Sequence, residues 1–474
     1  MPGPETGMQL RLLPAERRAA SGLAAIYAAR MLGLFMILPV FALHAGDLAG
    51  ATPVLIGIAI GAYGLTQALL QIPFGMLSDR LGRKRVISVG LLIFAAGSVV
   101  AALADSIVWM ILGRALQGAG AVAAAIMALV ADLTREEIRL RVMALIGASI
   151  GGAFALAMIL GPVLDRWFGL SGVFWSTACL ALLALATLWR WVPDPISARR
   201  HHDAEPVVGQ MRRVLVDAQL LRLDAGIFAL HAILTATFVA VPLLLRDDAH
   251  LPPGDHWLIY LSVLLGSFIT IVPFVIMAEK YRRLRAVFLG AIVVLGLAQL
   301  GLLYADPTAL WLGVLLWVFF SAFNLLEAAL PSLIAKTSPP EAKGTAMGVY
   351  SSAQFLGAFT GGALGGLAHG EFGGSGVFVL STLLALVWLG LAWSMKNPRY
   401  LATQVVRLDA TDGLGPEAIV ARLTGVRGVA EAVVLAEDGV AYLKVDRHAL
   451  DYEGLSRLTL NEPEVARDSA ESPS

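Results

Sequence analysis

Three charged side chains interrupt long apolar runs of this 474-residue chain: Arg30, Arg114 and Glu327. Each run is about 20 residues long, which is the length that crosses the hydrocarbon of a bilayer. A charge at the middle of such a helix costs about 2.5–3.5 kcal/mol on an insertion scale, so it must face protein or water and find a partner. Glu327 is the candidate proton carrier, and Arg30 could line a shared cavity with it. A fixed ion pair is the alternative.

The composition indicates a membrane protein. Hydrophobic residues make up 58% of the chain and charged residues 15%, whereas soluble domains carry roughly a quarter charged residues. The net charge is zero and the basic residues cluster in particular loops, so nucleic acid is not an expected partner. The single cysteine, Cys179, excludes a disulfide framework and a thiolate metal site. We expect no metal and no cofactor, and no clustered nucleophile, base or metal set indicates an enzyme.

The hydropathy pattern predicts about twelve membrane spans. Six candidates precede a long polar connection, near residues 22–43, 54–78, 86–104, 108–131, 142–164 and 170–192. Six follow it, near residues 219–245, 256–278, 286–304, 308–330, 343–368 and 374–395. The first stretch is too long for a signal peptide and precedes many further spans, so we interpret it as the first membrane helix.

The charges of the loops predict the orientation. Lys and Arg cluster after the even-numbered spans, whereas the intervening loops carry mostly Asp. Because cytoplasmic loops are enriched in Lys and Arg, we expect a multi-pass protein of the cell (inner) membrane with both termini in the cytoplasm. The bilayer is then an obligatory partner.

The chain divides into parts of different composition. We expect a cytoplasmic N-terminal segment at 1–20, a six-helix bundle at 21–192, a cytoplasmic linker at 193–218, a second six-helix bundle at 219–396, a soluble domain at 400–460 and a disordered tail at 461–474. The bundles resemble each other at an offset of 200 residues, because residues 79–85 align with 279–285 and Gly161 aligns with Gly361. A duplicated unit of six spans is typical of alternating-access carriers.

The loop after the second span is short and highly charged. Gly75 allows two helices to approach closely, and Gly82 permits a turn with positive φ. Asp79 and Arg83 place opposite charges where two helices meet, so they can form a conformational latch together with Arg80 and Lys84. The alternative is that these cations only enforce topology.

These residues resemble the major facilitator superfamily. The loop signature of that family matches Gly75, Asp79, Gly82, Arg83 and Lys84, and its fourth-helix signature matches Arg114, Gln117, Gly118, Gly120 and Ala121. The resemblance covers roughly residues 20–396. It implies an all-α membrane protein with the twelve-helix major-facilitator fold, built of two pseudo-symmetric six-helix bundles, and secondary transport of a small-molecule substrate.

The resemblance also implies roles for single residues. Arg83 would pair with Asp132 at the cytoplasmic end of the fourth span, and Asp79 would face the start of the eleventh. Arg114 would act in proton coupling, with Gln117 on the same helical face. The alternative for Arg114 is a structural anchor to neighbouring carbonyl groups.

Further polar residues share helical faces inside the predicted spans. Those that could bind substrate or protons, or join helices by hydrogen bonds, are Tyr63, Gln67, Gln71, Asn324, Tyr350 and Gln354. His231 in the seventh span is interpreted as a core histidine rather than a proton relay. Residues expected to serve close helix packing are Gly118, Gly120, Gly161, Pro162, Gly361 and Gly362.

One departure from the family concerns the direction of transport. Efflux members carry Gly-Pro-x-x-Gly-Gly in the fifth helix, whereas here Gly161 and Pro162 lead into Asp165 and Arg166. Our hypothesis is a proton-coupled antiporter that exports a small amphiphilic molecule and works as a monomer. A uniporter or importer, or a membrane sensor that signals through its tail domain, are the alternatives.

The soluble tail domain has its own pattern. Strands are expected at 402–409, 430–435 and 440–445, and helices at 416–423 and 449–460. This β-α-β-β-α order suggests a small α+β ferredoxin-like domain without a Cys-x-x-Cys metal motif. A facilitator with such an appendage resembles the YajR subgroup.

Overall fold

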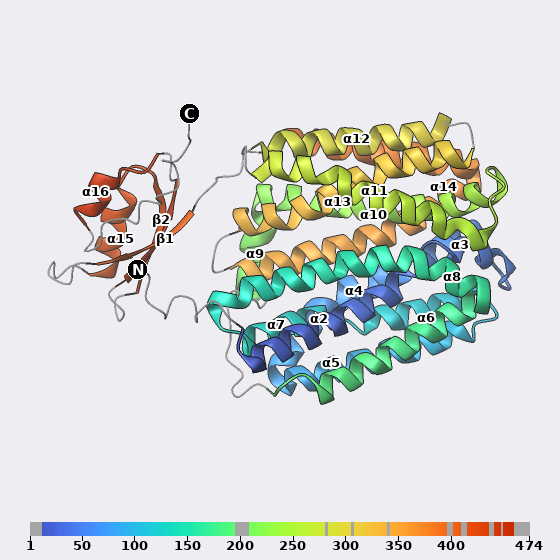
Figure 1. Ribbon diagram of the computed structural model, residues 1–474, viewed down its shortest axis with the longest axis horizontal. Coiled ribbons are helices and arrows are strands. Elements are labelled where there is room, and N and C mark those ends of the chain that lie inside the picture. The colour runs from blue at the N-terminus through green and yellow to red at the C-terminus, as the bar shows by residue number, and fades with distance from the viewer. Residues whose placement is uncertain are drawn as a thin grey trace, which may run out of the picture. The chain divides into compact units, whose positions relative to one another are not determined.

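The computed structural model describes residues 12–194, 208–279, 283–304, 308–338, 342–395, 402–408, 415–435, 440–446 and 449–458. The chain forms two compact units, Met1–Lys396 and Asn397–Ser474, and each is described by itself (Figure 1). The predicted tail at 461–474 and residues 195–207 of the predicted linker lie outside the described residues, as do residues 280–282 of the proposed repeat.

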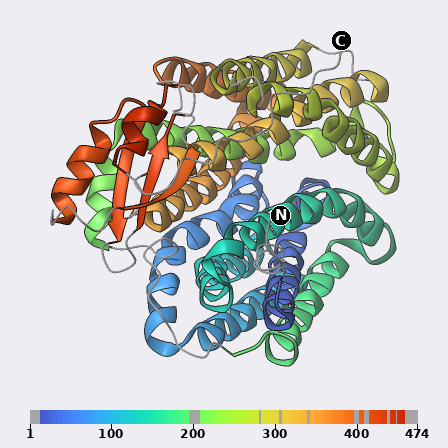
Figure 2. The same cartoon turned by 60° about the vertical axis from the view of Figure 1, so that its left-hand side comes forward.

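The regular secondary structure described in the first unit is helical, apart from an isolated bridge between Ala49 and Ser106. Its N-terminal half contains α2 (Pro14–Phe35), α3 (Phe41–His44), the 3-10 helix η1 (Ala45–Asp47), α4 (Pro53–Leu81), α5 (Arg83–Ala102), α6 (Ile107–Ala119), α7 (Ala123–Leu133) and α8 (Glu136–Arg190). Its C-terminal half contains α9 (Val208–Val216), α10 (Ala218–Asp247), the 3-10 helix η2 (Pro253–Asp255), α11 (His256–Glu279), α12 (Leu284–Tyr304), α13 (Ala309–Thr337) and α14 (Lys343–Trp393). Figure 2 shows the halves as two groups of helices, blue to green and yellow-green to orange.

The described residues contain nine helical segments long and apolar enough to cross a membrane. Two of these lie in α8, with 55 residues, and α14, with 51 residues. As one straight helix at 1.5 Å per residue, either would be roughly 80 Å long, more than twice the hydrocarbon thickness. Each therefore has to cross the membrane twice. Each reverses at a glycine with a φ of 65°, Gly169 and Gly373 respectively, a conformation that glycine adopts without steric cost.

Counting these two helices twice and adding α2 gives the predicted twelve spans. The first span differs from its predicted limits, because the helix ends at Phe35 and a turn leads into α3. Pro39 explains this break, since proline has no N–H to donate and its ring clashes with the carbonyl four residues earlier, that of Phe35.

The two halves meet where α4 and α14 pack backbone against backbone. A Cβ on Gly57 would collide with the backbone of Gly362 and Gly366, and one on Gly61 with that of Phe359. Only glycine allows such an approach. The pairing order shows that α4 runs antiparallel to the first part of α14, so the end of α4 lies beside the start of α14. We call this end of the first unit the Arg83 end and the opposite end the Asp165 end.

The C-terminal unit is a three-stranded antiparallel sheet with two helices. The elements are β1 (Ala402–Arg407), α15 (Pro416–Thr424), β2 (Val429–Leu435), β3 (Val440–Val445) and α16 (Tyr452–Ser456), and the strand order is β1-β3-β2. Its core includes Val406, Leu423, Leu443 and Leu455. The second helix is shorter than the predicted 449–460.

Candidate functional site

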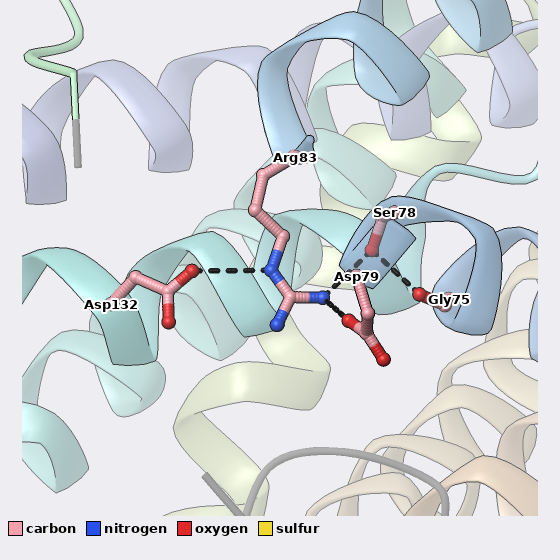
Figure 3. Close-up of polar contacts among 5 residues, drawn as sticks. All are labelled: Gly75, Ser78, Asp79, Arg83 and Asp132. Atoms are coloured by element: carbon pink, nitrogen blue, oxygen red, sulfur yellow. Dashed lines mark hydrogen bonds and ion pairs between the residues drawn. The ribbon is translucent and has the colours of Figure 1, made fainter. Parts of the chain in front are cut away.

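The loop signature forms a compact ionic cluster at the Arg83 end, which we call the Arg83 cluster (Figure 3). Gly82 has a φ of 94° and separates α4 from α5. The guanidinium of Arg83 donates to Asp132 Oδ2 through Nε at 3.1 Å and to Ser78 Oγ through Nη1 at 2.8 Å. It also pairs with Asp79. The cluster therefore joins α4, α5 and α7.

The ion pair between Arg83 and Asp132 is buried. The two side chains are 4% and 0% exposed, whereas that of Asp79 is 25% exposed. A buried charge that loses its partner is costly, so this ion pair restrains the three helices that it joins. The structure brings Arg83 and Asp132 together as the resemblance implied.

The other charged residues of the loop have different surroundings. Lys84 donates to the Val192 carbonyl at 2.7 Å and pairs with Asp194 at 2.7 Å, so it holds the end of α8. Arg80 is exposed. The resemblance implied that Asp79 faces the start of the eleventh span. In the described part of the chain, the hydrogen-bond partner seen for Asp79 is Arg83.

A second cluster lies inside the N-terminal half and holds two arginines around one aromatic ring. The guanidinium carbons of Arg30 on α2 and Arg114 on α6 lie 5.8 Å and 5.5 Å from the centroid of the Tyr63 ring on α4. Both arginines are 1% exposed. A cation over an aromatic face is attracted by the ring quadrupole. We call these three residues the arginine cluster.

Arg114 is held by backbone. It donates to the carbonyls of Ala59 at 3.4 Å and Ile60 at 3.2 Å, and to Gln117 Oε1 at 2.7 Å. Gln117 in turn donates to Ser98 at 2.8 Å. These contacts fit the alternative for Arg114, a structural anchor to neighbouring carbonyl groups.

Arg30 has free hydrogen-bonding capacity. Its Nη2 donates to Gln67 Oε1, and Gln67 donates to Gln71 at 2.9 Å, while Nε and Nη1 have no hydrogen-bond partner. Among the described residues, no carboxylate pairs with either arginine of the cluster. In this part of the described chain, Arg30 and Arg114 are thus buried without a carboxylate as counter-ion.

The C-terminal half holds a third cluster around Glu327 on α13, which we call the Glu327 cluster. The amide of Gln354 on α14 lies 3.2 Å from Glu327 Oε1 and 2.9 Å from Nε2 of His231 on α10. The distance between His231 Nε2 and Glu327 Oε2 is 3.8 Å. Arg30 and Glu327 therefore bind different partners in this conformation, and the alternative of a fixed ion pair between these two residues is not seen.

Sequence reasoning missed one carboxyl group. The sequence singles out Glu327 as the carboxylate inside a span of the second half, but Asp224 on α10 is also buried, with 6% exposure. Both of its carboxyl oxygens lack a hydrogen-bond partner, as does the hydroxyl of Tyr350 on α14. The spacing of Asp224 and His231, seven residues on one helix, would have placed both on one face. Asn324, another of the predicted polar residues, donates a hydrogen bond to Ser267 at 2.9 Å.

Aromatic side chains connect the two halves. Phe154 on α8 lies against Phe320 and Phe323 on α13, with ring centroids 5.9 Å and 6.1 Å apart. Phe355 on α14 lies 6.0 Å from the Tyr63 ring. Phe355 thus contacts the arginine cluster through Tyr63, and Phe323 lies 5.9 Å from the ring of His231 in the Glu327 cluster, so apolar rings lie beside both charged clusters.

The residues that depart from the family pattern lie at the Asp165 end. Asp165 bonds His44 Nε2 at 2.9 Å, and this hydrogen bond raises the pKa of His44 above its ordinary value of 6.5. Arg166 pairs with Asp255 of the other half at 3.5 Å. Arg246 of the C-terminal half donates to the Leu43 carbonyl at 3.2 Å. Two of these contacts bridge the halves.

The predicted packing glycines lie at close helix contacts. A Cβ on Gly118 would meet the Tyr63 backbone, one on Gly120 that of Gly90, and one on Gly161 that of Met36. Pro162 lies within α8. Gly361 lies against Ala232, and Gly362 against Gly57. Within the described ranges, no group of three His, Cys, Asp or Glu residues could hold a metal ion.

Comparisons with known proteins agree with this architecture. The model of the Major Facilitator Superfamily matches residues 23–264 and 223–428. The chain is 48% identical over 438 residues to the inner membrane transport protein YajR of Escherichia coli (strain K12), covering 92% of this chain and 96% of that protein. It is 27% identical over 385 residues to the multidrug resistance protein MdtH of Yersinia enterocolitica, covering 78% and 92%.

A solved structure supports the fold. A bacterial homologue of the human lysosomal transporter Spinster, in an inward-facing and occupied conformation, matches with a TM-score of 0.65 at 14% identity. The match covers 80% of this chain and 97% of that one. At this identity the likeness concerns the arrangement of the helices alone.

Proposed function

Because the chain belongs to the major facilitator superfamily, we propose that it is a proton-coupled exporter of a small amphiphilic molecule and works by alternating access. Membership makes it an integral multi-pass membrane transporter with a small-molecule substrate, and not an enzyme. The identity to YajR supports the predicted subgroup. The coupling to protons, the direction of transport and the chemical class of the substrate are proposed here.

One observation carries the proton coupling. The Glu327 side chain lies within α13 and is 35% exposed, with its carboxyl oxygens beside side chains of α10 and α14. Its polar neighbours are Gln354 and His231, and no arginine or lysine pairs with it within the described residues. A carboxyl group in such surroundings binds a proton readily and can release it when the environment changes. Glu327 is therefore the proposed proton carrier.

The same interior favours an amphiphilic cargo. The rings of Phe154, Phe323 and Phe355 offer apolar contact, while the unpartnered nitrogens of Arg30 and the side chain of Gln71 offer polar contact. Ligand sites combine apolar walls with a few placed polar groups. The name of MdtH, a multidrug resistance protein, is in line with export of such compounds.

We propose the orientation and the conformational cycle from charges and contacts. The Arg83 end carries the basic loops and is the proposed cytoplasmic face of the inner membrane, with both termini on that side. The contacts Arg166–Asp255 and Arg246–Leu43 hold the halves together at the Asp165 end. The structure is then an inward-facing state, and Asp79 of the Arg83 cluster is the residue proposed to engage the start of α14 when the halves rock to close the Arg83 end.

For the C-terminal unit we propose a ferredoxin-like fold. The antiparallel order β1-β3-β2, with helices after β1 and β3, matches three strands of that fold. We propose that this unit is accessory to transport by a monomer, which predicts that a chain ending before residue 400 still transports.

Transport by purified protein in liposomes tests the proposal. The experiment uses a panel of fluorescent amphiphilic dyes, a pH gradient of either sign, and a pH-sensitive dye inside the liposomes. We expect dye movement against its gradient, driven by protons moving the opposite way, and its loss in Glu327→Gln. Glu371→Gln, an exposed carboxyl on α14, is the control and should transport normally. Dye movement that ignores the pH gradient would make the protein a uniporter and overturn the coupling.

A further inference from the structure

Arg30 on α2 is a buried cation with unused hydrogen-bond donors. It is 1% exposed, and its Nε and Nη1 have no hydrogen-bond partner. Its Nη2 donates to the neutral side chain of Gln67. The great majority of buried polar groups in folded proteins are satisfied, and a guanidinium does not lose its proton in proteins. Arg30 therefore calls for an acceptor that also carries a negative charge.

A second arginine adds to the positive charge of this region. The guanidinium groups of Arg30 and Arg114 both approach the Tyr63 ring. Among the described residues, neither arginine pairs with a carboxylate. Arg114 has acceptors of its own, the carbonyl oxygens of Ala59 and Ile60. Arg30 is therefore the cation of the arginine cluster that has donors left for a ligand.

Aromatic rings lie around the Arg30 guanidinium. The ring centroid of Phe94 on α5 lies 5.7 Å from its central carbon, and the rings of Tyr63 and Phe94 meet edge to face with centroids 6.4 Å apart. Phe355 of the C-terminal half lies 6.0 Å from the Tyr63 ring. Sites for organic ligands combine apolar walls with a few placed polar groups. These surroundings fit an anionic group that is attached to an apolar body.

We propose that Arg30 binds a carboxylate group of the cargo, and that the transported amphiphile is an ionised apolar acid. This inference rests on the proposed function and names the charge of its substrate. One carboxylate oxygen accepts a hydrogen bond from Nε or Nη1 of Arg30, and the apolar body lies against the aromatic rings. Hydrogen bonds between ionised groups are stronger than those between neutral groups. The bound carboxylate also supplies the missing counter-ion.

The site lies beside the contact between the two halves. The Phe355 carbonyl lies so close to Gly64 of α4 that a Cβ there would collide with it, and the Phe355 ring lies against Tyr63. A residue of the C-terminal half therefore covers the arginine cluster. Tyr63, Gln67 and Gln71 follow at intervals of four residues along one face of α4 toward the Arg83 end. When the halves rock, Phe355 moves with the C-terminal half, and this polar row leads a carboxylate to the arginine cluster.

Two matched compounds test the requirement for a negative charge. Naphthoate and naphthamide share one ring system and differ in the charge of the head group. Their binding to the purified full-length protein is measured by calorimetry at neutral pH. We expect naphthoate to bind about tenfold or more tightly than naphthamide, the lower range for hydrogen bonds to a charged group. Naphthoate should also raise the melting temperature, because a ligand stabilises the state that it binds.

Variants of Arg30 assign this preference to one side chain. Arg30→Gln should bind the two compounds equally, and Arg30→Lys, which keeps the charge, should retain part of the preference. Arg17→Gln removes an exposed arginine of the same helix and should behave as the wild type. Because Arg30→Gln removes a buried charge that has no counter-ion, the melting temperature of the ligand-free protein should change little.

The outcomes that would overturn the site are distinct from failure of the proposed function. Equal binding of the two compounds by the wild type, or a preference for naphthoate that persists in Arg30→Gln, would overturn the carboxylate site. A large fall of the ligand-free melting temperature in Arg30→Gln would show a structural role and do the same. Stabilisation by chloride through Arg30, with none added by naphthoate, would make this an inorganic anion site and overturn the assignment to the cargo.

Transport measurements separate the two proposals. Dye transport driven by a pH gradient, without any preference for naphthoate, would leave the proposed function standing and overturn the carboxylate site. Naphthoate binding through Arg30 in a protein that transports neither dye nor naphthoate would overturn the proposed function, and with it the assignment of the bound acid as cargo.

Discussion

Arg83 Nε donates a hydrogen bond of 3.1 Å to Asp132 Oδ2, and this contact ties the first residue of α5 to the penultimate residue of α7. Neither side chain exceeds 4% exposure. The pair also shares the guanidinium with Ser78 and Asp79 of α4. A change in the relative positions of these helices would therefore strain or break a buried ion pair.

Replacing one member of this pair should destabilise the protein strongly. Asp132→Asn leaves the Arg83 charge buried with a weaker partner, and such losses cost about 3–5 kcal/mol. Thermal unfolding of the purified protein measures the effect. The double variant Arg83→Gln, Asp132→Asn should lose less stability than the sum of the single variants, because the two residues interact. Additive losses would show that the pair is energetically unimportant in this state.

The glycine contact between α4 and α14 should tolerate no side chain. Gly57→Val forces the backbone of Gly362 and Gly366 away, and overpacking costs typically about 1–3 kcal/mol. We expect a lower melting temperature and loss of dye transport. A Cβ on Gly390 of α14 would meet nothing within 4 Å, so Gly390→Val is the control. Equal behaviour of the two variants would refute the close packing of the halves.

The sequence predicted the membrane class from the length of its apolar runs, and the resemblance of its loop and fourth-helix motifs to a known family implied the fold and the pair Arg83–Asp132. It did not predict which partners the buried charges choose. Arg30 bonds Gln67, and Glu327 lies beside Gln354, since these contacts depend on how each helix is rotated about its axis.

Asp224 illustrates the same limit. Only six residues separate it from the start of α10, so hydropathy places it at the edge of a span, where a carboxylate would reach water. In the structure the neighbouring helices cover it, and it is 6% exposed. Burial of a residue near a helix end is set by tertiary packing, which a single sequence does not display.

The two buried arginines should respond differently to lysine. Arg114 uses three nitrogens to bond two carbonyls and Gln117, a fork that lysine cannot reproduce. Arg114→Lys should therefore lower stability by about 1.5–3 kcal/mol, the range for hydrogen bonds to a charged group. Arg30 makes a single side-chain hydrogen bond, to Gln67, so Arg30→Lys should alter dye affinity more than melting temperature. The reverse pattern would show that Arg30 is the structural residue and Arg114 the binding residue.

The pair His44–Asp165 should make stability depend on pH at the Asp165 end. Its hydrogen bond raises the pKa of His44 above 6.5 in the folded protein, and the charge of Asp47 acts in the same direction. The protonated histidine then adds stability that is fully present below pH 6.5 and is lost as the pH rises through the raised pKa. Melting temperatures of the wild type and His44→Gln, compared from pH 5 to pH 9, should differ most at pH 5 and converge at pH 9. The control variant Asp105→Asn should show the same dependence of melting temperature on pH as the wild type. A difference between the wild type and His44→Gln that grows with pH would contradict the role given to His44.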